Sequence, residues 1–174
     1  MAIGHIYLSC VGWYISVSDA FLIIVDMVCG ILFGTLLAAV VESFISTQGG
    51  LSAVSTLVSS MYGFICGAYM PISSFSEGLR NTLSLLPGTY GVGIMRHHYM
   101  NGYMQAFADE MHMQTVDEVT ISNVINGMRD SFDANLYFFG NEMPLGAMYG
   151  ILLGTCALLA VAFVGIVIIK NTKK

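Results

Sequence analysis

Long uncharged hydrophobic runs alternate with short polar segments along this chain. The longest run covers residues 145–169 without a charged residue, and three lysines follow within the last five residues. At about 1.5 Å of rise per residue, a helix of this length crosses the ~30 Å hydrocarbon core of a bilayer. Because a helix satisfies its own backbone hydrogen bonds, the run predicts a transmembrane helix.

Three further hydrophobic runs precede it. Residues 20–41 contain one charge, Asp26, residues 51–69 contain none, and both runs are long enough to cross a bilayer. Residues 2–17 would form a helix of only ~24 Å, so we expect this run to be the end of a longer helix. Together the runs predict an all-α, polytopic transmembrane bundle of about four spans.

A proline turn after the third run introduces a short amphipathic segment. Pro71 should end the preceding helix because proline lacks a backbone donor. Ser74 and Glu77 have the spacing of a capping box, and Pro87 should stop the new helix. Its leucines recur on one face: Leu79, Leu83 and Leu86. We expect a short interfacial or re-entrant helix outside a crossing.

The charges are distributed unevenly. Residues 97–143 hold seven of the eleven acidic residues, and residues 1–79 hold no Lys or Arg. Because Lys and Arg favour the cytoplasmic side, the lysine-rich carboxyl terminus is expected to be cytoplasmic, with residues 97–143 as an extracytoplasmic loop. The polar turn at 42–50 should lie on the same side as the carboxyl terminus.

The acidic loop should contain a helix of its own. Thr115 and Glu118 match a second capping box. An apolar stripe follows at steps of four, three and four residues: Ile121, Ile125, Met128 and Phe132. Such a stripe has to pack on something, and the outer face of the bundle is the expected partner.

Composition excludes several functional classes. The chain is 56% hydrophobic and 10% charged, against ~25% charged for a typical soluble domain. Its net charge of -5 and its six Lys and Arg argue against a nucleic-acid partner. The four cysteines stand alone in apolar runs, without zinc-ligand spacing, and are expected to be small buried hydrophobic residues.

The sequence also lacks the common motifs of catalytic and cofactor-binding sites. The sequence holds no P-loop, no H-E-x-x-H and no G-x-S-x-G elbow. The glycines of GTYGVG follow a proline rather than a strand, so the dinucleotide fingerprint fails. One group could be drawn as a metal site but matches no known ligand spacing: His97, His98, His112, Asp109 and Glu110. We expect neither an enzyme nor a bound metal or cofactor.

Polar residues inside the runs are the candidates for a transport path. Asp26 lies within the second run, where a carboxylate should face protein, water or a cation; alternatively it reaches the outer interface. The third run is rich in hydroxyls, which line a wetted groove or bond back to their own helix. The path candidates are Asp26, Ser52, Ser55, Thr56 and Ser59.

Glycines repeat every four residues in three of the runs. This spacing places side-chain-free surface on one helix face, where another backbone can approach. The glycines concerned are Gly30 and Gly34, Gly63 and Gly67, and Gly146, Gly150 and Gly154. They predict helix packing, either within the chain or at a dimer seam.

Residues 63–102, GFICGAYMPISSFSEGLRNTLSLLPGTYGVGIMRHHYMNG, resemble the type-2 ATP-binding-cassette (ABC) exporter permeases. In that family the fifth span ends in a Gly-x-x-Pro-like turn, short helices cap the outer side, and a Pro-x-x-Tyr leads towards an Arg. Pro71, Pro87, Tyr90 and Arg96 occupy the matching positions. The resemblance extends from about residue 21 through the tail and includes FDANLYFFGN at 132–141.

The resemblance implies the permease subunit of an ATP-driven exporter in the cell membrane. Such a subunit pairs with a second permease, identical or different, and with a separate ATPase that binds the ATP. Alternating access would move a drug, peptide, lipid or polysaccharide outwards, a choice that the sequence leaves open. The resemblance suggests an extracellular gate formed by Pro71, Glu77, Pro87, Tyr90 and Arg96.

The family usually has six spans, and the four runs here correspond to spans three to six. The first two spans and the coupling helix that receives the ATPase are missing, so we expect residues 1–174 to be the carboxyl-terminal part of a larger permease. The alternative function is a non-transporting membrane sensor or assembly scaffold that binds a partner through the acidic loop.

Overall fold

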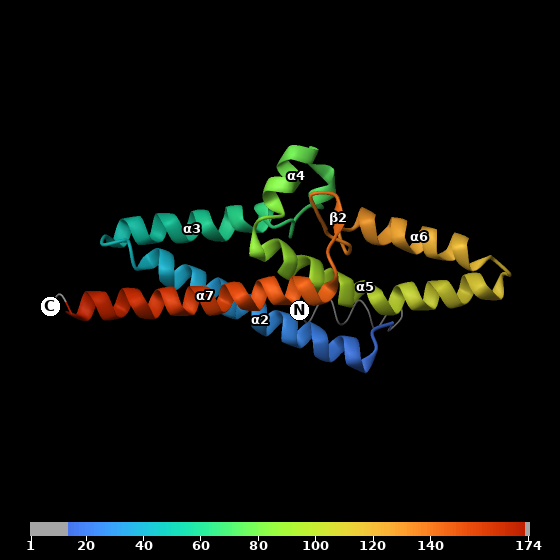
Figure 1. Ribbon diagram of the computed structural model, residues 1–174, viewed down its shortest axis with the longest axis horizontal. Helices are drawn as coiled ribbons and strands as arrows, with labels where there is room; N and C mark the ends of the chain where they lie inside the picture. Colours follow the sequence, from blue (N-terminus) through green and yellow to red (C-terminus); the bar gives the residue numbers. More distant parts are fainter. Residues whose placement is uncertain (1–13, 173–174) are drawn as a thin grey trace.

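The structure, a computed structural model, describes residues 14–172, without the side chains of Leu57 and Ser59. It is all-α with one small hairpin (Figure 1). The elements are α2 (Val17–Glu42), α3 (Gln48–Ile65), the 3-10 turn η1 (Ile72–Ser74), α4 (Glu77–Leu83), α5 (Pro87–Met113), α6 (Glu118–Ser131), β1 (Tyr137–Phe138), β2 (Asn141–Glu142) and α7 (Leu145–Thr172). The predicted run 2–17 lies almost entirely outside the described residues.

Three of the predicted hydrophobic runs form helices, although the third, 51–69, is helical only to Ile65, so that α3 ends before Pro71 is reached. The run 20–41 lies within α2, and the run 145–169 lies within α7. Among the described helices these two are long and apolar enough to span a membrane, whereas the shorter, hydroxyl-rich α3 is not in that class. Of the four spans expected from the sequence, the described residues therefore supply two by length and composition.

These two helices keep most of their apolar surface exposed. Only 22% of the most apolar stretch of α2 and 6% of that of α7 is buried inside the structure. The exposed side chains include Phe21, Ile24, Ile31, Leu158, Val161, Val164 and Ile168. The core helix of a soluble protein would be mostly buried, so this surface calls for another apolar environment.

The core lies where α2, α5 and α7 pack against one another. Its buried cluster consists of Cys29, Phe33, Tyr90, Ile94, Leu136, Met148 and Leu152. Helix α6 packs against α5 through its apolar stripe, of which Ile121 is buried. Of the four cysteines predicted to be buried, Cys29 and Cys66 are buried free thiols, Cys156 is only partly buried, and Cys10 lies outside the described residues.

Helix α5 is the main difference from the sequence prediction. Pro87 was expected to stop a helix, but it is the first residue of α5, which continues for 27 residues to Met113. Proline suits this position because the first turn of a helix needs no backbone donor and its fixed φ is already helical. The first part of the predicted loop 97–143 is consequently regular helix.

Both predicted capping boxes were shifted. Ser76 occupies the N-cap position of α4 without a side-chain capping bond, since Ser74 belongs to η1. Thr115 adopts a left-handed backbone with φ of 61°, and the side chain of Asp117 caps α6 instead. Capping depends on which residue first leaves the helical conformation, and Ser, Thr and Asp compete for that role.

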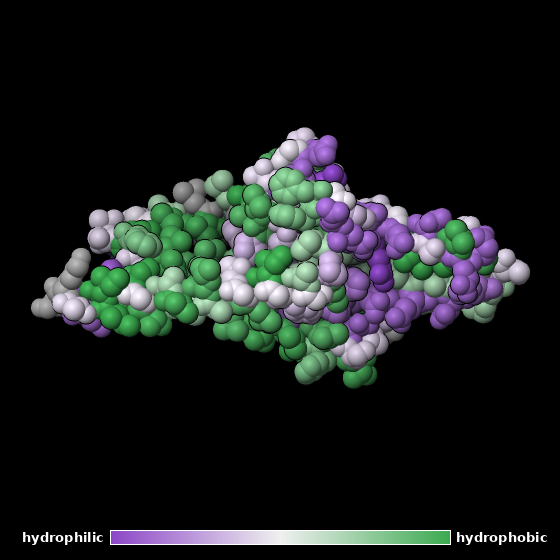
Figure 2. All heavy atoms as spheres, in the orientation of Figure 1, coloured by the Kyte–Doolittle hydropathy of each residue, from purple (hydrophilic) through white to green (hydrophobic). Residues whose placement is uncertain are grey.

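Hydrophobic and hydrophilic residues gather at opposite ends of the long axis. Figure 2 shows hydrophobic residues over the end formed by α3 and the carboxyl-terminal part of α7, and hydrophilic residues over the far part of α5 and over α6. The Lys170 ammonium donates a hydrogen bond to the carbonyl of Ser43. The turn after α2 and the end of α7 therefore lie at one end of the molecule, as the sequence predicted.

Candidate functional site

A cavity of about 770 Å³ lies between α2, the end of α3, the turn before η1, and α5. We call it the central cavity. Its lining includes Asp26, Phe33, Tyr62, Pro71, Arg96 and Phe132. The volume falls within the ~300–1,000 Å³ of typical ligand pockets, and the lining is mostly apolar, as such pockets usually are.

Residues predicted for the path and for the gate meet at this cavity. Asp26 comes from the middle of α2, Pro71 from the turn after α3, and Arg96 from α5. They are distant in sequence, and the fold brings them to the same cavity. Gly30 and Gly63 also line the cavity, although the sequence assigned them to helix packing.

The carboxylate of Asp26 is buried within protein rather than turned to water. Its side chain is 2% exposed, which excludes the alternative of a carboxylate reaching the outer interface. Oδ1 accepts a hydrogen bond from the Tyr149 hydroxyl of α7. His98 of α5 lies with Nε2 3.9 Å from Asp26 Oδ2 and 3.1 Å from the Tyr149 oxygen.

A second buried carboxylate stands on the other side of the same imidazole. Asp19 Oδ1 lies 3.7 Å from His98 Nδ1, and its side chain is 6% exposed. Asp19 precedes Asp26 by seven residues, or nearly two helical turns, so both carboxylates lie on the α2 face towards α5. We call Asp19, His98 and Asp26 the Asp-His-Asp cluster.

The Asp19 carboxylate of this cluster accepts hydrogen bonds from two side chains. Asn101 Nδ2 donates to Asp19 Oδ1 at 3.2 Å, and the Ser16 hydroxyl donates to Asp19 Oδ2 at 2.7 Å. Arg129 of α6 donates to Asn101 Oδ1 at 3.4 Å. The Asp19 carboxylate is therefore hydrogen-bonded by neutral donors, and the cation Arg129 bonds to one of them, Asn101.

The Asp26 carboxylate, by contrast, has one oxygen without a hydrogen bond. Among the buried side-chain atoms of the described residues, Asp26 Oδ2 is the one without a hydrogen-bond partner. A buried carboxylate oxygen without a donor is costly unless the group holds a proton or a cation approaches it. Two carboxylates share one imidazole here, so even a protonated His98 leaves the cluster short of one positive charge.

Arg96 joins three segments at the other wall of the cavity. Its guanidinium donates to the carbonyls of Gly67 and Phe132, and NH1 lies 3.4 Å from Asp133 Oδ2. Gly67 follows α3 and has a φ of 79°, a left-handed conformation that glycine adopts without strain. Arg96 thus connects α5 to the end of α3 and to the turn after α6.

Asp133 anchors the turn that Pro71 begins. Its carboxylate accepts hydrogen bonds from the backbone N–H groups of Ile72 and of Ser73, the latter at 3.1 Å. Asp133 is 5% exposed, and these donors are the free N–H groups at the start of η1. One carboxylate therefore satisfies η1 and balances Arg96.

The other predicted gate residues do not line the central cavity. Tyr90 is a core residue whose hydroxyl donates to the carbonyl of Ser84 at 2.6 Å, just past α4. Pro87 begins α5, and Glu77 is exposed at the start of α4. Tyr90 and Pro87 position α4 relative to α5.

A hairpin holds α4 from the opposite side. The Ser84 hydroxyl donates to the carbonyl of Tyr137 at 3.1 Å, and the Tyr137 hydroxyl donates to Asp130 at 3.0 Å. Burial, and then this hydrogen bond to the Asp130 carboxylate, raise the pKa of Tyr137. The hydroxyl consequently stays protonated and donating over the physiological pH range.

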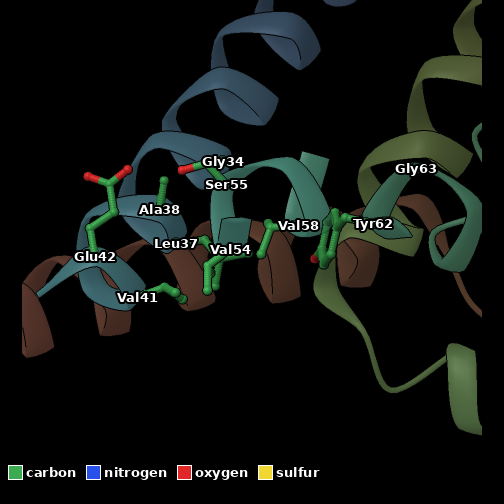
Figure 3. Close-up of a pocket in the computed structure, with 10 residues that line it drawn as sticks. All are labelled: Gly34, Leu37, Ala38, Val41, Glu42, Val54, Ser55, Val58, Tyr62 and Gly63. Atoms are coloured by element: carbon green, nitrogen blue, oxygen red, sulfur yellow. The ribbon is translucent and has the colours of Figure 1, made fainter. Parts of the chain in front are cut away.

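The hydroxyl face of α3 is only partly directed to a cavity. Ser55 lines a smaller cavity of about 270 Å³ between α2 and α3, which Figure 3 shows with Glu42 at one end and Tyr62 at the other. Thr56 bonds back to the carbonyl of Ser52 at 2.9 Å, and both side chains are exposed. The side chain of Ser59, also predicted for the path, lies outside the described residues.

Most of the predicted packing glycines have no close neighbour. A Cβ built on any of five of them meets no described atom within 4 Å: Gly30, Gly34, Gly146, Gly150 and Gly154. A Cβ on Gly63 would lie 2.5 Å from the Tyr69 ring. Close approaches also occur in α5, where a Cβ on Gly93 would lie 2.4 Å from Leu136 and one on Gly88 2.7 Å from Cys66.

Sequence reasoning missed Asp19, His98, Asn101 and Asp133. The spacing of seven between Asp19 and Asp26 was the available signal, since it places two acids on one face of an apolar helix. His98 was assigned to a solvated loop because α5 was not predicted. Asp133 gave no signal, because its role depends on contacts with residues about 60 positions earlier.

The described residues contain no group of three or more His, Cys, Asp or Glu placed to hold a metal ion. His112 is exposed and lies fourteen residues after His98 on α5, or ~21 Å along the helix. The comparisons with protein-family models, with curated proteins and with solved structures each find no match.

Proposed function

We propose that this chain is the permease subunit of an ATP-driven exporter of the type-2 ABC class. The observation that carries the proposal is the central cavity, which Asp26, Pro71 and Arg96 line together. These residues were singled out from the sequence for two different roles, path and gate. A path needs a cavity within the bundle and a gate at its outer end, and a cavity lined by residues of both predicted groups supports this assignment.

Membrane insertion is supported by the exposed apolar surfaces of α2 and α7. In water this surface would forgo the ~25 cal/mol that removal of each Å² of apolar area from water contributes, whereas lipid supplies an apolar environment for it. Helix α6 and the lysine-bearing end of α7 lie at opposite ends of the molecule (Figure 1). We place α6 outside the cell and Lys170 in the cytoplasm.

In this arrangement α2, α3 and α7 cross the bilayer. Helix α3, at 18 residues, covers ~27 Å and needs only slight thinning of the lipid. The start of α5 lies against the end of α3, because Gly88 adjoins Cys66. From there α5 runs away from the apolar end (Figure 1), so its far part lies outside the membrane.

The gate is the unit formed by η1 and α4. In the chain this unit follows α3 and precedes α5. Asp133, which pairs with Arg96, holds η1, and Ser84, just past α4, bonds to the hairpin. These contacts join the unit to the turn after α6 and to the hairpin. Rigid-body movement of α5 against α3 would carry the gate and open the cavity outwards, as alternating access requires.

A second permease subunit would meet the open glycine faces. Gly146, Gly150 and Gly154 lie on one face of α7, where nothing in the described part of the chain comes close. Small residues at this spacing allow another helix to approach within van der Waals contact. The nucleotide would be bound by a separate ATPase, with the turn 42–50 as a minor contact to it.

Co-purification tests this proposal. The full-length chain, tagged at its carboxyl end, is extracted from its native membrane in mild detergent and captured, and the associated proteins are identified. We expect a nucleotide-binding subunit in stoichiometric amount and vanadate-sensitive ATP hydrolysis by the complex. Reconstituted in vesicles, this complex should move a substrate only when ATP is present.

A stable partner without a nucleotide-binding motif, retained through α6 and the hairpin, would instead identify the chain as a scaffold or sensor. The exporter assignment would then be wrong. An Ile121→Asp variant separates the two functions, because Ile121 attaches α6 to the bundle. A scaffold should lose its partner, whereas an exporter should keep its ATPase.

A further inference from the structure

We propose that the central cavity binds a lipophilic organic cation, held by the carboxylate of Asp26 and by the aromatic rings of the cavity wall. The inference rests on the proposed function, in which this cavity is the transport path, and names the substrate class. It begins from the unpartnered Asp26 Oδ2, on a side chain that is 2% exposed and lines the cavity.

The charge balance around Asp26 favours a cation. Asp19 and Asp26 contribute two negative charges, and His98 contributes at most one positive charge between them. Arg129 bonds to Asn101 rather than to either carboxylate. Tyr149, the remaining polar group from α7, donates to Asp26 without adding charge. In the empty cavity a proton can supply the missing charge, and a bound cation can replace that proton.

Arg96, at the opposite wall of the cavity, does not supply the positive charge that is missing at Asp26. Its guanidinium is already engaged by two carbonyls and lies 3.4 Å from Asp133 Oδ2. The Arg96 charge is therefore matched locally, whereas the Asp26 charge is not. An anion would have to displace Asp133, which also holds the N–H groups of η1.

The rest of the wall suits a large apolar cation. Four aromatic rings line the cavity: Phe33, Tyr62, Tyr99 and Phe132. Aromatic faces attract cations that lack hydrogen-bond donors, such as quaternary ammonium groups. A strongly hydrated metal ion would find one carboxylate and few other oxygens, so the wall favours a poorly hydrated organic cation.

Binding of two size-matched ions to the purified full-length chain tests the inference. Tetraphenylphosphonium and tetraphenylborate have nearly the same shape and opposite charge. By equilibrium dialysis in detergent, we expect saturable binding of the phosphonium and at least about tenfold weaker binding of the borate. Equal affinity for the two ions would show that the cavity binds apolar ions without regard to charge. Tighter binding of the borate would indicate that Arg96 holds the ion. Either result overturns the inference.

Variants of α2 then identify the anchor. Asp26→Asn should weaken phosphonium binding at least about tenfold, whereas Asp26→Glu should retain most of it. Glu42→Gln, which removes an exposed acid from the same helix at the smaller cavity, is the matched control and should bind like wild type. Undiminished binding by a folded Asp26→Asn variant would refute the role of Asp26.

A proton measurement adds a readout that needs no variant. If the phosphonium replaces a proton, binding in weakly buffered solution should release up to about one proton per ion. Borate should release none. These assays use no ATPase, so a failed co-purification leaves the cation site standing. A chain that recruits an ATPase but does not select the phosphonium keeps the exporter function and loses this substrate class.

Discussion

Arg96 and Asp133 form an ion pair of 3.4 Å that joins α5 to the turn after α6 at the edge of the central cavity. The pair also reaches the end of α3, through the Arg96 bond to the carbonyl of Gly67. Asp133 in turn holds the backbone of η1. One pair thus determines how the proposed gate sits on the bundle.

Replacing Asp133 by Asn should release the gate. The amide keeps the shape and tolerates the left-handed backbone at Asp133, but it removes the charge opposite Arg96 and one acceptor of η1. Each group left unsatisfied costs about 1–3 kcal/mol. We expect a lower unfolding temperature in detergent and faster proteolysis between residues 67 and 76.

Asp130→Asn is the control for this change. Asp130 accepts hydrogen bonds from Asn135 and Tyr137 in the neighbouring turn and is less buried than Asp133. It should leave the protease pattern of residues 67–76 unchanged. Equal effects of the two variants would show that Asp133 has no special role in holding η1.

The close contact between Gly93 and Leu136 predicts a coupled pair of substitutions. A Cβ at Gly93 would lie 2.4 Å from the Leu136 side chain, so Gly93→Ala should destabilise by about 1–3 kcal/mol through overpacking. In a Leu136→Ala background most of that loss should disappear. The unfolding temperatures of the two single variants and the double variant measure the coupling.

Gly127→Ala is the matched glycine control. Gly127 lies inside α6 with open space around its Cβ position, so alanine should stabilise the helix by up to about 1 kcal/mol. Strict additivity of Gly93→Ala and Leu136→Ala would contradict the packing described for α5.

The open glycine face of α7 predicts a dimer seam. Gly150→Leu should reduce recovery of a second permease subunit in a pull-down with two differently tagged chains, because the side chain would block close helix approach. The stability of the single chain should stay close to wild type, since no described atom lies within 4 Å of that Cβ. Unchanged recovery of the second subunit would place the seam elsewhere.

Helix α6 should respond to acid through its cap. Hydrogen bonds from the side chain and the backbone N–H of Thr120 hold the pKa of Asp117 below its usual range. The resulting stabilisation is complete above the unfolded pKa, about 3.9 for Asp, and is lost as the pH falls through the lower folded value.

Hydrogen exchange of the α6 amides, corrected for intrinsic rates, measures this effect. Asp117→Ala should lower protection at neutral pH and remove most of its further decline in acid. Asp109→Asn, at an exposed acid in α5, should behave like wild type. Full protection of the Asp117→Ala helix at neutral pH would show that α6 does not depend on its cap.

Hydrophobic length predicted the two most apolar helices. The runs 20–41 and 145–169 gave α2 and α7 because a long uncharged stretch has few other stable conformations. Helix α5 escaped prediction because it begins at Pro87 and carries glycines and polar residues that mimic a loop. Its stability comes from packing on α2 and α7, which local sequence does not encode.

Part of the candidate site was also predictable from the sequence. Asp26, Pro71 and Arg96 stood out as a lone intramembrane charge or as parts of a motif, and they meet at the central cavity. The partners that give them their chemistry did not stand out. His98 meets Asp26 across 72 positions, and Asp133 meets Arg96 across 37, so both contacts arise from tertiary structure alone.

Labelling in intact cells tests the membrane arrangement most directly. In a chain whose four cysteines are replaced by alanine, Asn126→Cys places a thiol on the exposed face of α6, and Asn171→Cys places one at the end of α7. A membrane-impermeant maleimide should label the cysteine at 126 in intact cells, and that at 171 only after permeabilisation. The reverse pattern, or equal labelling of both before permeabilisation, would contradict the proposed topology and the exporter function that depends on it.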